Sequence, residues 1–350
     1  VTTVGSITTV AEAEEILAAG KADMVAMARP LMAEPNLLKN AYAGKPEKSR
    51  PCLRCYECAS AVAHQLHCAV NPTCGRETQY RVLPKAEEKK KCVVIGGGPS
   101  GMQAVQTLAK RGHEVVLFEK EKTLGKKLYE ISNLSFKHDM RRYWQWDVDT
   151  TMACGAKVYL GTEATPELVM AEEPDAIFIA TGSSPIVPSI PGIERTAGIL
   201  DVDNKRVEVG QKVVVCGGGL SGTECALELA YEGKDVTVVD MLPAQAFAKD
   251  AAPSPYTMLH ALMKKNNVKL VGNAKVLSIS DEGVEIIDRD LNHAYLEADT
   301  VVNALGMRPN KDVVDKFACL IPEVYVIGDA AAVGNMRHAT ASAFIPAVEC

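Results

Sequence analysis

The sequence predicts an α/β protein that contains two similar Rossmann-like domains, and three observations lead to this prediction. From Cys92 onward, apolar strand patterns alternate with helical patterns, as they do in α/β domains with parallel sheets. The apolar run and glycine-rich turn of residues 93–101 return at residues 213–222, which indicates two copies of one unit. A length of 350 residues is enough for two or three domains, each with its own core.

The composition excludes several classes of function. The formal charge is -6 and no basic stripe is present, so we do not expect a nucleic acid as a partner. No apolar run reaches the roughly 18 residues that cross a bilayer, and the first residues do not form a basic-then-apolar leader, so we expect a cytoplasmic protein without a membrane partner. The expected partner is a small-molecule substrate, and the sequence allows a homo-oligomer.

Both ends of the chain fall inside regular patterns. Val1 lies in an apolar strand-like run and Cys350 lies within a helical pattern, so we expect a fragment of a longer protein. Residues 1–6 predict a strand, Thr9 is a suitable N-cap for a helix that stops at Gly20, and residues 23–28 predict a second strand. Two parallel strands do not make a stable sheet alone, so we expect that their partner strands lie upstream or are missing.

The remaining segments divide the chain. Residues 45–83 are rich in cysteine, proline and polar residues with little periodicity, which predicts a loop-built segment. Residues 85–91 form a charged linker, and we interpret them as a solvated boundary. Three prolines between residues 185 and 191 indicate a crossing linker, and a return crossing is expected near residues 301–309.

Each copy of the repeat places a GxGxxG motif after a strand and before a helix, the context that a dinucleotide fingerprint requires. The first glycine allows a tight turn, the second lets the backbone approach a pyrophosphate, and the third lets the helix pack against the strand. The helix N-terminus then faces the phosphates. The predicted cofactor-binding residues are Gly96, Gly98, Pro99, Ser100 and Gly101 in the first copy and Gly217, Gly219, Leu220 and Gly222 in the second.

An acid ends the next strand of each copy, eighteen residues after the last glycine. These acids are Glu119 and Asp240. Such an acid accepts hydrogen bonds from a ribose hydroxyl and repels a 2′-phosphate. The first site should therefore take the ADP half of a dinucleotide, and the second should prefer NADH over NADPH. The alternative is that both are strand-helix turns without a ligand.

Two further motifs resemble the FAD signatures of the glutathione-reductase-like disulfide reductases. They are Ala180-Thr181-Gly182 after an apolar strand and Gly328-Asp329-Ala330 after another. The resemblance implies FAD on the first fingerprint, an inserted NAD(H) domain, and a return to the FAD domain, where Asp329 contacts the ribityl or pyrophosphate region. Ala164 is assigned to the cofactor site too, and Gly306 lies at the return crossing. The redox CxxC of disulfide reductases is absent from this domain, which disfavours disulfide reduction.

Four closely spaced cysteines supply the number of thiolates that a [4Fe-4S] cluster takes. They are Cys52, Cys55, Cys58 and Cys68. A four-cysteine zinc site is the alternative, although structural zinc more often uses two separated CxxC pairs. We leave Cys74 unassigned and expect His64 and His67 to be surface histidines of the loop.

With Ala28-Arg29-Pro30 before the cysteines and Val70-Asn71-Pro72 after them, the chain resembles the C-terminal part of multidomain flavoproteins related to old yellow enzyme. This group includes bacterial dienoyl-CoA reductase, clostridial enoate reductase, trimethylamine dehydrogenase and the bile-acid oxidoreductases. The resemblance implies that residues 1–45 are the end of an FMN-binding (β/α)8 barrel. Gly5, Ser6, Ala28 and Arg29 would then hold the FMN phosphate, although the family usually has glycine at position 28; a surface salt bridge is the alternative for Arg29.

The resemblance also implies a domain order and an electron path. The barrel remnant (1–45) and iron-sulfur segment (46–84) precede an FAD-binding domain (88–190 and 300–350) interrupted by an NAD-binding domain (191–299). Electrons from NADH would pass through FAD and the [4Fe-4S] cluster to FMN, which would reduce an activated C=C bond of an enoate or enoyl-CoA substrate. No catalytic residue is assigned, because the resemblance places those residues in the part of the barrel that this sequence lacks.

Three other functions remain open. An amine dehydrogenase of the same family would run electrons the other way, and Asp240 argues against it because it indicates a working NADH site. An electron-transfer subunit resembling the small subunit of glutamate synthase would also place cysteines before an FAD domain, but Ala28-Arg29-Pro30 favours a barrel. A scaffold that binds adenylates without turnover would contain no flavin.

Overall fold

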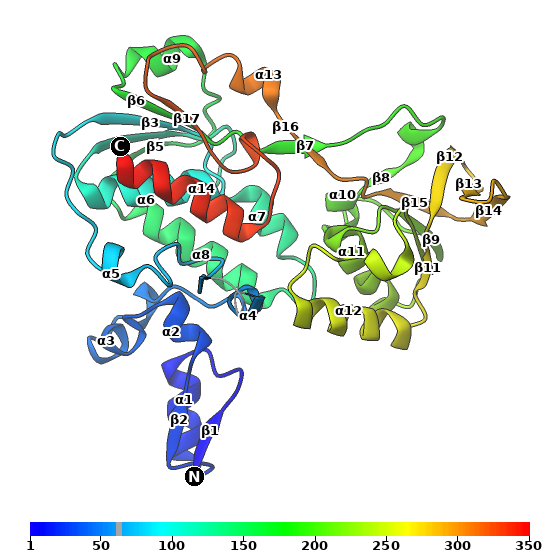
Figure 1. Ribbon diagram of the computed structural model, residues 1–350, viewed down its shortest axis with the longest axis horizontal. Coiled ribbons are helices and arrows are strands. Elements are labelled where there is room, and N and C mark those ends of the chain that lie inside the picture. The colour runs from blue at the N-terminus through cyan, green and yellow to red at the C-terminus, as the bar shows by residue number, and fades with distance from the viewer. Residues whose placement is uncertain (61–64) are drawn as a thin grey trace. The chain divides into compact units, whose positions relative to one another are not determined.

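The computed structural model describes residues 1–60 and 65–350 (Figure 1), so the prediction for His64 lies outside the described residues. The chain divides into two compact units. The first comprises Val1–Tyr129, Asp139–Ser183 and Pro309–Cys350, and the second comprises Glu130–His138 and Ser184–Arg308. Each unit contains a five-stranded sheet, which agrees with the predicted α/β fold class.

The sheet of the first unit is parallel throughout and has the order β17-β6-β3-β4-β5. Its strands are β3 (Lys91–Ile95), β4 (Glu114–Phe118), β5 (Lys157–Tyr159), β6 (Ala176–Ile179) and β17 (Val324–Val326). Numbered by position in the unit, this is the 3-2-1-4-5 order of a Rossmann sheet. The central strand β3 is completely apolar at its buried positions, as expected for a strand covered on both faces.

Helices cover both faces of this sheet (Figure 1). Alternate residues of β3 point to opposite faces, so Cys92 and Val94 join one core cluster and Val93 and Ile95 join another. The first cluster includes residues of α6 and α14, and the second includes residues of α9 and α13. The helices that follow β3 in this unit are α6 (Pro99–Arg111), α7 (Lys126–Ile131), α8 (His138–Met152), α9 (Pro166–Ala171), α13 (Lys311–Val314) and α14 (Met336–Glu349), although the end of α7 and the first residue of α8 fall within Glu130–His138 of the second unit.

The second unit has the parallel order β11-β10-β9-β15-β8. Its first four strands in this order repeat the topology of the first sheet, but the outer strand β8 precedes β9 in the chain, whereas β17 comes last. One face carries helices and the other carries a three-stranded antiparallel sheet, β12-β13-β14. The strands are β8 (Ala197–Gly198), β9 (Lys212–Cys216), β10 (Asp235–Val239), β11 (Lys269–Val271), β12 (Ala274–Ser280), β13 (Gly283–Asp288), β14 (His293–Glu297) and β15 (Thr300–Asn303). The helices are α10 (Ile199–Asp203), α11 (Leu220–Tyr231) and α12 (Pro253–Lys265).

The crossings between the units differ from the predicted domain boundaries. Residues 300–303 were expected in the FAD-binding domain, but they form β15, which pairs with β9 inside the second sheet. Residues 184–190 also belong to the second unit, and the chain returns to the first unit at Pro309. The two short strands β7 (Ser183–Pro185) and β16 (Met307–Pro309) mark the crossings. The sequence predicted a return crossing near residues 301–309, but it did not identify β15 or the sheet that it joins.

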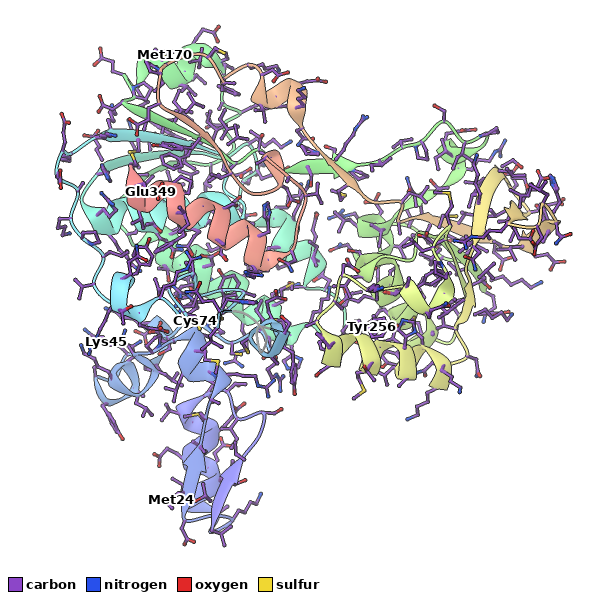
Figure 2. All side chains as sticks on the ribbon, in the orientation of Figure 1. Met24, Lys45, Cys74, Met170, Tyr256 and Glu349 are labelled. Atoms are coloured by element: carbon purple, nitrogen blue, oxygen red, sulfur yellow. The ribbon has the colours of Figure 1, made fainter. Side chains whose placement is uncertain are left out.

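The N-terminal residues form the predicted strand-helix-strand unit, with β1 (Thr2–Val4), α1 (Val10–Ala18) and β2 (Met24–Ala26). Thr9 is the N-cap of α1 and forms a capping box with Glu12. Strands β1 and β2 pair in parallel as a two-stranded sheet. Met24 of β2 is 61% exposed (Figure 2), so this small sheet leaves apolar side chains uncovered.

The cysteine segment has little regular structure in its described part, as predicted. It follows α2 (Arg29–Ala33) and α3 (Leu37–Tyr42) and contains two one-turn helices, α4 (Glu57–Ser60) and α5 (Glu77–Tyr80). Within residues 1–60 and 65–350, the remaining short elements are 3₁₀ turns: η1 (Pro46–Lys48), η3 (Ile193–Arg195), η4 (Ala244–Ala246) and η5 (Gly328–Ala330).

Candidate functional site

The first glycine-rich turn joins β3 to α6 at the carboxyl end of the central strand. Gly96 has φ +101°, and a Cβ there would lie 2.5 Å from the carbonyl oxygen of Ala180. A Cβ at Gly101 would lie 1.9 Å from the carbonyl oxygen of Gly96, so neither position has room for a side chain. At Gly98, by contrast, φ is -74° and no atom lies within 4 Å of an added Cβ. The turn is therefore closed against the sheet and open at its middle glycine.

The second turn, between β9 and α11, has the same construction. A Cβ at Gly217 would lie 2.1 Å from the carbonyl oxygen of Ala304, and one at Gly222 would lie 2.1 Å from that of Gly217. Gly219 again has no atom within 4 Å of an added Cβ. Each turn lies where the strand order reverses, which in open α/β sheets is the place where ligands bind.

The two acids lie against the turns that the sequence paired them with. Glu119 is buried, and its Oε2 accepts a hydrogen bond of 2.6 Å from the backbone N–H of Gly97. The Oδ2 of Asp240 accepts one of 2.7 Å from the N–H of Gly218. A carboxylate has about four acceptor positions, so both acids keep lone pairs for a ribose hydroxyl. The two acids, which stand at the same distance from their glycines in the sequence, thus make equivalent hydrogen bonds to the two turns in the structure.

The two FAD-type signatures meet the first turn. A Cβ at Gly328, which has φ +59°, would lie 2.3 Å from the Oγ of Ser100. The Asp329 carboxylate accepts hydrogen bonds from the Ser183 hydroxyl (2.8 Å) and from the N–H of Gly334 (3.1 Å). The structure therefore brings together residues from distant parts of the first unit: Gly96, Pro99, Ser100, Gly101, Ala180, Thr181, Gly182, Gly328 and Asp329.

Sequence reasoning missed two residues at these places, and it placed a third, Ala304, only at the return crossing. Ser183 holds Asp329, and Asn310 donates from its side chain to the carbonyl oxygen of Thr181 (3.0 Å). Ala304 is the counterpart of Ala180, because each presents its carbonyl oxygen to the first glycine of a turn. Aligning the two repeats beyond their glycines would have found Ala304, since an A-x-G tripeptide follows the fourth strand of both sheets.

Two predicted residues lie at the margins of these sites. Ala164 is in the loop between β5 and α9 and packs against the core cluster on one face of the first sheet. Gly306 has φ +99°, and its carbonyl oxygen accepts a hydrogen bond of 2.9 Å from the N–H of Ile186.

The four predicted cysteines line one pocket. They are Cys52, Cys55, Cys58 and Cys68, and the rest of the lining comes from α2 and the adjoining loops: Arg29, Met32, Leu53, Arg54, Tyr56, Ala69 and Val70. Backbone N–H groups donate to the sulfur atoms: Arg54 to Cys52 at 3.4 Å, Glu57 to Cys55, and Val70 and Asn71 to Cys68. Such N–H···S bonds favour the thiolate.

Burial acts in the opposite direction on these thiols. Burial raises the pKa of the Cys52 and Cys68 thiols above the ordinary value. Cations would therefore be needed to displace the thiol protons at neutral pH. Within residues 1–60 and 65–350, no three His, Cys, Asp or Glu side chains are arranged to hold a single metal ion. Four thiols around one pocket, with N–H donors aimed at them, fit the donor set of an iron-sulfur cluster.

The structure also describes Cys74 and His67, the two other residues that the sequence analysis considered near the cysteines. Cys74 is buried, and burial raises the pKa of its thiol to about 12. His67 was expected on the surface, but its side chain is only 17% exposed and its Nε2 lies 3.4 Å from Glu57. His67 is therefore partly buried, like Cys68, which follows it in the chain.

The residues predicted for the FMN phosphate follow neighbouring parallel strands. Gly5 and Ser6, both with positive φ (124° and 53°), follow β1, and Ala28 and Arg29 follow β2. Carboxyl ends of parallel strands meet at one edge of a sheet, so the four residues share that edge. Within the described residues Arg29 forms no ion pair, and its guanidinium lies 4.4 Å from the centroid of the Tyr56 ring.

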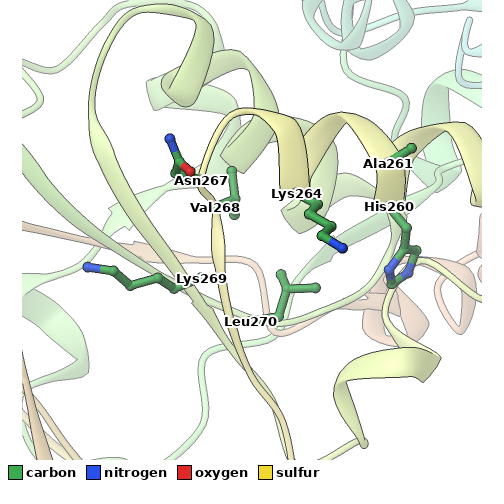
Figure 3. A pocket seen from close by; sticks show the side chains of 7 residues that line it. All are labelled: His260, Ala261, Lys264, Asn267, Val268, Lys269 and Leu270. Atoms are coloured by element: carbon green, nitrogen blue, oxygen red, sulfur yellow. The ribbon is translucent and has the colours of Figure 1, made fainter.

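A shallow pocket of about 680 Å³ lies elsewhere in the second unit (Figure 3). Its lining residues come from α12, the following turn and β11: His260, Ala261, Lys264, Asn267, Val268, Lys269 and Leu270. Lys269 begins β11, so the pocket is at the amino end of that strand. Strands β9, β10 and β11 are parallel, so their carboxyl ends lie at the same edge of the sheet. The glycine-rich turn follows β9 at that edge, whereas the pocket lies at the opposite edge, so the two are separate.

Comparisons with known proteins match this geometry. The model of the pyridine nucleotide-disulphide oxidoreductase family matches residues 90–343. Cinnamate reductase of Clostridium sporogenes is 35% identical over 94% of this chain and 50% of its own length, and NADH oxidase of Thermoanaerobacter brockii is 37% identical over 98% and 54%. A 2-naphthoyl-CoA reductase in complex with 2-naphthoyl-CoA has a TM-score of 0.93 and 31% identity, covering 100% of this chain and 54% of that one.

Both curated relatives extend well beyond the region that they share with this chain. The chain spans about half the length of the curated relatives that it matches. No helix within the described residues is both long and apolar enough to span a bilayer.

Proposed function

Because the chain belongs to the pyridine nucleotide-disulphide oxidoreductase family, we propose that it is the NADH-oxidising part of an iron-sulfur flavoprotein oxidoreductase. Membership of this family and the similarity to an NADH oxidase support binding of FAD and NAD(H). The predicted FAD-binding domain (88–190 and 300–350) then falls in the first unit except for residues 130–138, 184–190 and 300–308, which belong to the second unit together with the predicted NAD-binding domain (191–299).

One observation carries the proposal: each unit fixes a carboxylate on the middle of a glycine-rich turn at its switch point. Glu119 and Asp240 bond the N–H groups of Gly97 and Gly218 in the same way. Next to each carboxylate, the open position at Gly98 or Gly219 and the first N–H groups of a long helix can receive a pyrophosphate. Two dinucleotides in one chain is what hydride transfer between NADH and FAD requires.

In the first unit, the chain's residues would hold FAD at both ends of the dinucleotide. Glu119 would accept a ribose hydroxyl, and the N-terminus of α6 at Pro99 and Ser100 would face the phosphates. Asp329, oriented by Ser183, would contact the ribityl or pyrophosphate region. In the second unit, Gly219, Leu220 and Asp240 would hold NADH, and the charge of Asp240 would repel the 2′-phosphate of NADPH.

The cysteine segment (46–84) would hold a [4Fe-4S] cluster through Cys52, Cys55, Cys58 and Cys68. When bound, NADH supplies a hydride, the flavins exchange electrons in pairs or singly, and the cluster carries them one at a time toward FMN. We propose that residues 1–45 contribute Gly5, Ser6, Ala28 and Arg29 to an FMN phosphate site, which depends on further barrel strands.

The substrate class is inferred from the relatives. Two of them are named as reductases of cinnamate and of 2-naphthoyl-CoA, both of which contain a C=C bond conjugated to a carbonyl group. We propose that the complete protein reduces an activated C=C bond of an enoate or enoyl-CoA type.

The test is a visible spectrum of the anaerobically purified chain, recorded before and after addition of NADH, with measurement of FAD, iron and sulfide. Flavin bands with a broad iron-sulfur shoulder, both bleached by NADH, are expected. A protein with flavin but no iron would contradict the cluster assignment. A colourless protein that still binds NADH would contradict the flavin assignment.

A further inference from the structure

We propose that Asp250 is a displaceable carboxylate that occupies the pyrophosphate position of the second glycine-rich turn, and that NADH must push it aside to bind. This role rests on the proposed function, because it requires that the turn binds NADH. It makes Asp250 a residue that determines nucleotide affinity, in addition to Asp240, which was predicted from the sequence.

Asp250 lies at the N-terminus of α11, where the proposed function places the pyrophosphate. Its carboxylate accepts a hydrogen bond from the backbone N–H of Leu220, the first residue of that helix, at 3.1 Å through Oδ1 and 3.4 Å through Oδ2. The first N–H groups of a helix have no partner within it and carry partial positive charge, so they attract anions. An N–H group that is directed at one anion does not serve a second, so Asp250 and a phosphate exclude each other here.

The segment that carries Asp250 is anchored on the turn by buried residues. The N–H of Ala248 donates to the carbonyl oxygen of Gly218 (2.8 Å), and a Cβ at Gly218 would lie 2.7 Å from the ring of Phe247. Phe247 and Ala248 are fully buried, whereas Asp250 is exposed. The side chain of Asp250 can therefore leave the helix without uncovering apolar surface, while the anchor keeps it close enough to return.

The neighbouring charges have roles that differ from that of Asp250. Asp240 bonds a different N–H group of the turn. Glu224 of α11 is close enough for its charge to interact with that of Asp250, but Lys137 pairs with Glu224 at 2.6 Å. Lys249 precedes Asp250 and is exposed, and its positive charge would attract a pyrophosphate rather than exclude it. Asp250 is thus the acid that competes with the nucleotide for the N-terminus of α11.

The first unit differs at the corresponding position. The residue after the open Gly98 is Pro99, which has no N–H to offer a carboxylate, whereas Leu220 follows Gly219 in the second unit. In the proposed function the first turn holds FAD, which stays bound, and the second holds NADH, which must enter and leave as NAD⁺ in each turnover. An anion of the protein that occupies the second turn for part of the time lowers the apparent affinity for both forms and favours their exchange.

The test compares the dissociation constant of ADP-ribose, which has the pyrophosphate of NADH but no hydride to transfer, in the parent chain, Asp250→Ala and Asp250→Asn. Titration calorimetry is performed on samples of known FAD content. Asp250→Ala should bind about tenfold more tightly, because the competing acceptor and its charge are both lost. Asp250→Asn should gain less, since an amide still accepts from Leu220 but carries no charge. The KM for NADH should fall by the same factors, and the affinity for adenosine, which has no phosphate, should not change.

Asp299→Ala is the matched control. The Asp299 carboxylate is exposed and also accepts hydrogen bonds from backbone N–H groups, those of Gln211 (2.9 Å) and Lys212 (2.7 Å). Lys212 begins β9, so this carboxylate lies at the edge of the sheet opposite to the glycine-rich turn. Asp299→Ala removes the same charge and the same kind of bond, so the affinity for ADP-ribose should stay at the parent value.

The outcomes separate this role from the proposed function. A parent chain that binds neither ADP-ribose nor NADH would overturn the proposed function and the role of Asp250 with it. A parent that binds both, with an affinity that is unchanged or weaker in Asp250→Ala, would overturn the role alone, because Asp250 would then only support the turn. An equal gain for adenosine would also overturn it, since the effect would not act on the pyrophosphate. If Asp250→Ala does not fold, Asp250→Asn decides by the same criteria.

Discussion

Asp240 binds two backbone N–H groups at once, that of Gly218 through Oδ2 (2.7 Å) and that of Leu242 through Oδ1 (2.8 Å). The carboxylate is therefore held in one orientation beside the open glycine of the turn. Asp240→Asn should lower the preference for NADH over NADPH by about tenfold or more, because a charged acceptor is lost and the repulsion of a 2′-phosphate disappears. The measurement is the ratio of kcat/KM for NADH to that for NADPH, with an artificial electron acceptor.

Asp235→Asn is the control for this substitution. Asp235 begins the same strand but is exposed and paired with Lys269, so its loss should leave the preference unchanged. An unaltered ratio in Asp240→Asn would remove Asp240 from the nucleotide site.

Asp147 of α8 is a buried acid outside the nucleotide sites, and it should make stability depend on pH. Burial raises the pKa of its carboxyl from 3.8 to about 7, although Gln106 donates a hydrogen bond of 2.7 Å to Oδ1. The folded protein therefore binds this proton more tightly than the unfolded chain does. Stability should fall as pH rises between these two values, by up to about 1.4 kcal/mol per pH unit, and level off above the folded pKa.

Asp147→Asn tests this assignment, since an amide keeps the acceptor for Gln106 without titrating. The free energy of unfolding in urea, measured from about pH 5 to 8, should fall less steeply in the variant than in the parent. Parallel curves for the two proteins would show that Asp147 titrates normally.

At the scale of elements, the glycines within each strand-turn-helix unit have different roles. Gly222 lets α11 approach β9, and a Cβ there would collide with the backbone of Gly217 at 2.1 Å. Gly219 has ordinary helical-cap angles and open space in front of it. We expect Gly222→Ala to destabilise the second unit by about 1–3 kcal/mol, because the backbone must shift to relieve the clash. Gly219→Ala should leave stability unchanged but weaken NADH binding, because the methyl group occupies the space proposed for the pyrophosphate.

Thermal unfolding and NADH affinity measured on both variants check this division. Gly98→Ala and Gly101→Ala form the same pair in the first unit, with FAD content in place of NADH affinity. If Gly219→Ala bound NADH as tightly as the parent, the proposed pyrophosphate position would be wrong.

At the scale of elements, the sequence predicted the features that local patterns with strict spacing specify. The glycine turns, the N-cap at Thr9 and the strands that lead into the turns depend on residues close in the chain, so each pattern predicted its own element. The partner of each turn could not be predicted in the same way. Ala304 reaches Gly217 only because β15 joins the second sheet beside β9, and no local pattern in Thr300–Asn303 specifies that pairing. Ser183 and Asn310 were missed for the same reason.

At the scale of the whole molecule, the order of segments was predictable because each segment has its own signature, but contacts between segments were not. Arg29 was assigned to a phosphate from a tripeptide, and only the folded chain shows it stacked on Tyr56 beside the cysteines. The FAD-binding domain was predicted to resume at residue 300, but the chain re-enters the first unit only at Pro309, because β15 completes the second sheet before the chain leaves that unit. Pro309 is the last residue of the range 301–309 in which the return crossing was expected. Long-range packing decides such contacts and crossings.

The positions of the proposed sites along the chain lead to a prediction about activity. Both nucleotide turns and the cysteine pocket are complete within the described residues, whereas β1 and β2 pair only with each other in that part of the chain. Two strands enclose no pocket for a substrate. The chain should therefore oxidise NADH with ferricyanide as acceptor but should not reduce cinnamate under anaerobic conditions, with Gly219→Ala lowering the first activity. Because the NADH site acts without the substrate site, supplying the further barrel strands that complete the proposed FMN-binding barrel around residues 1–45 should add alkene reduction without changing the KM for NADH. Reduction of cinnamate by the chain alone would place the substrate site among residues 1–350.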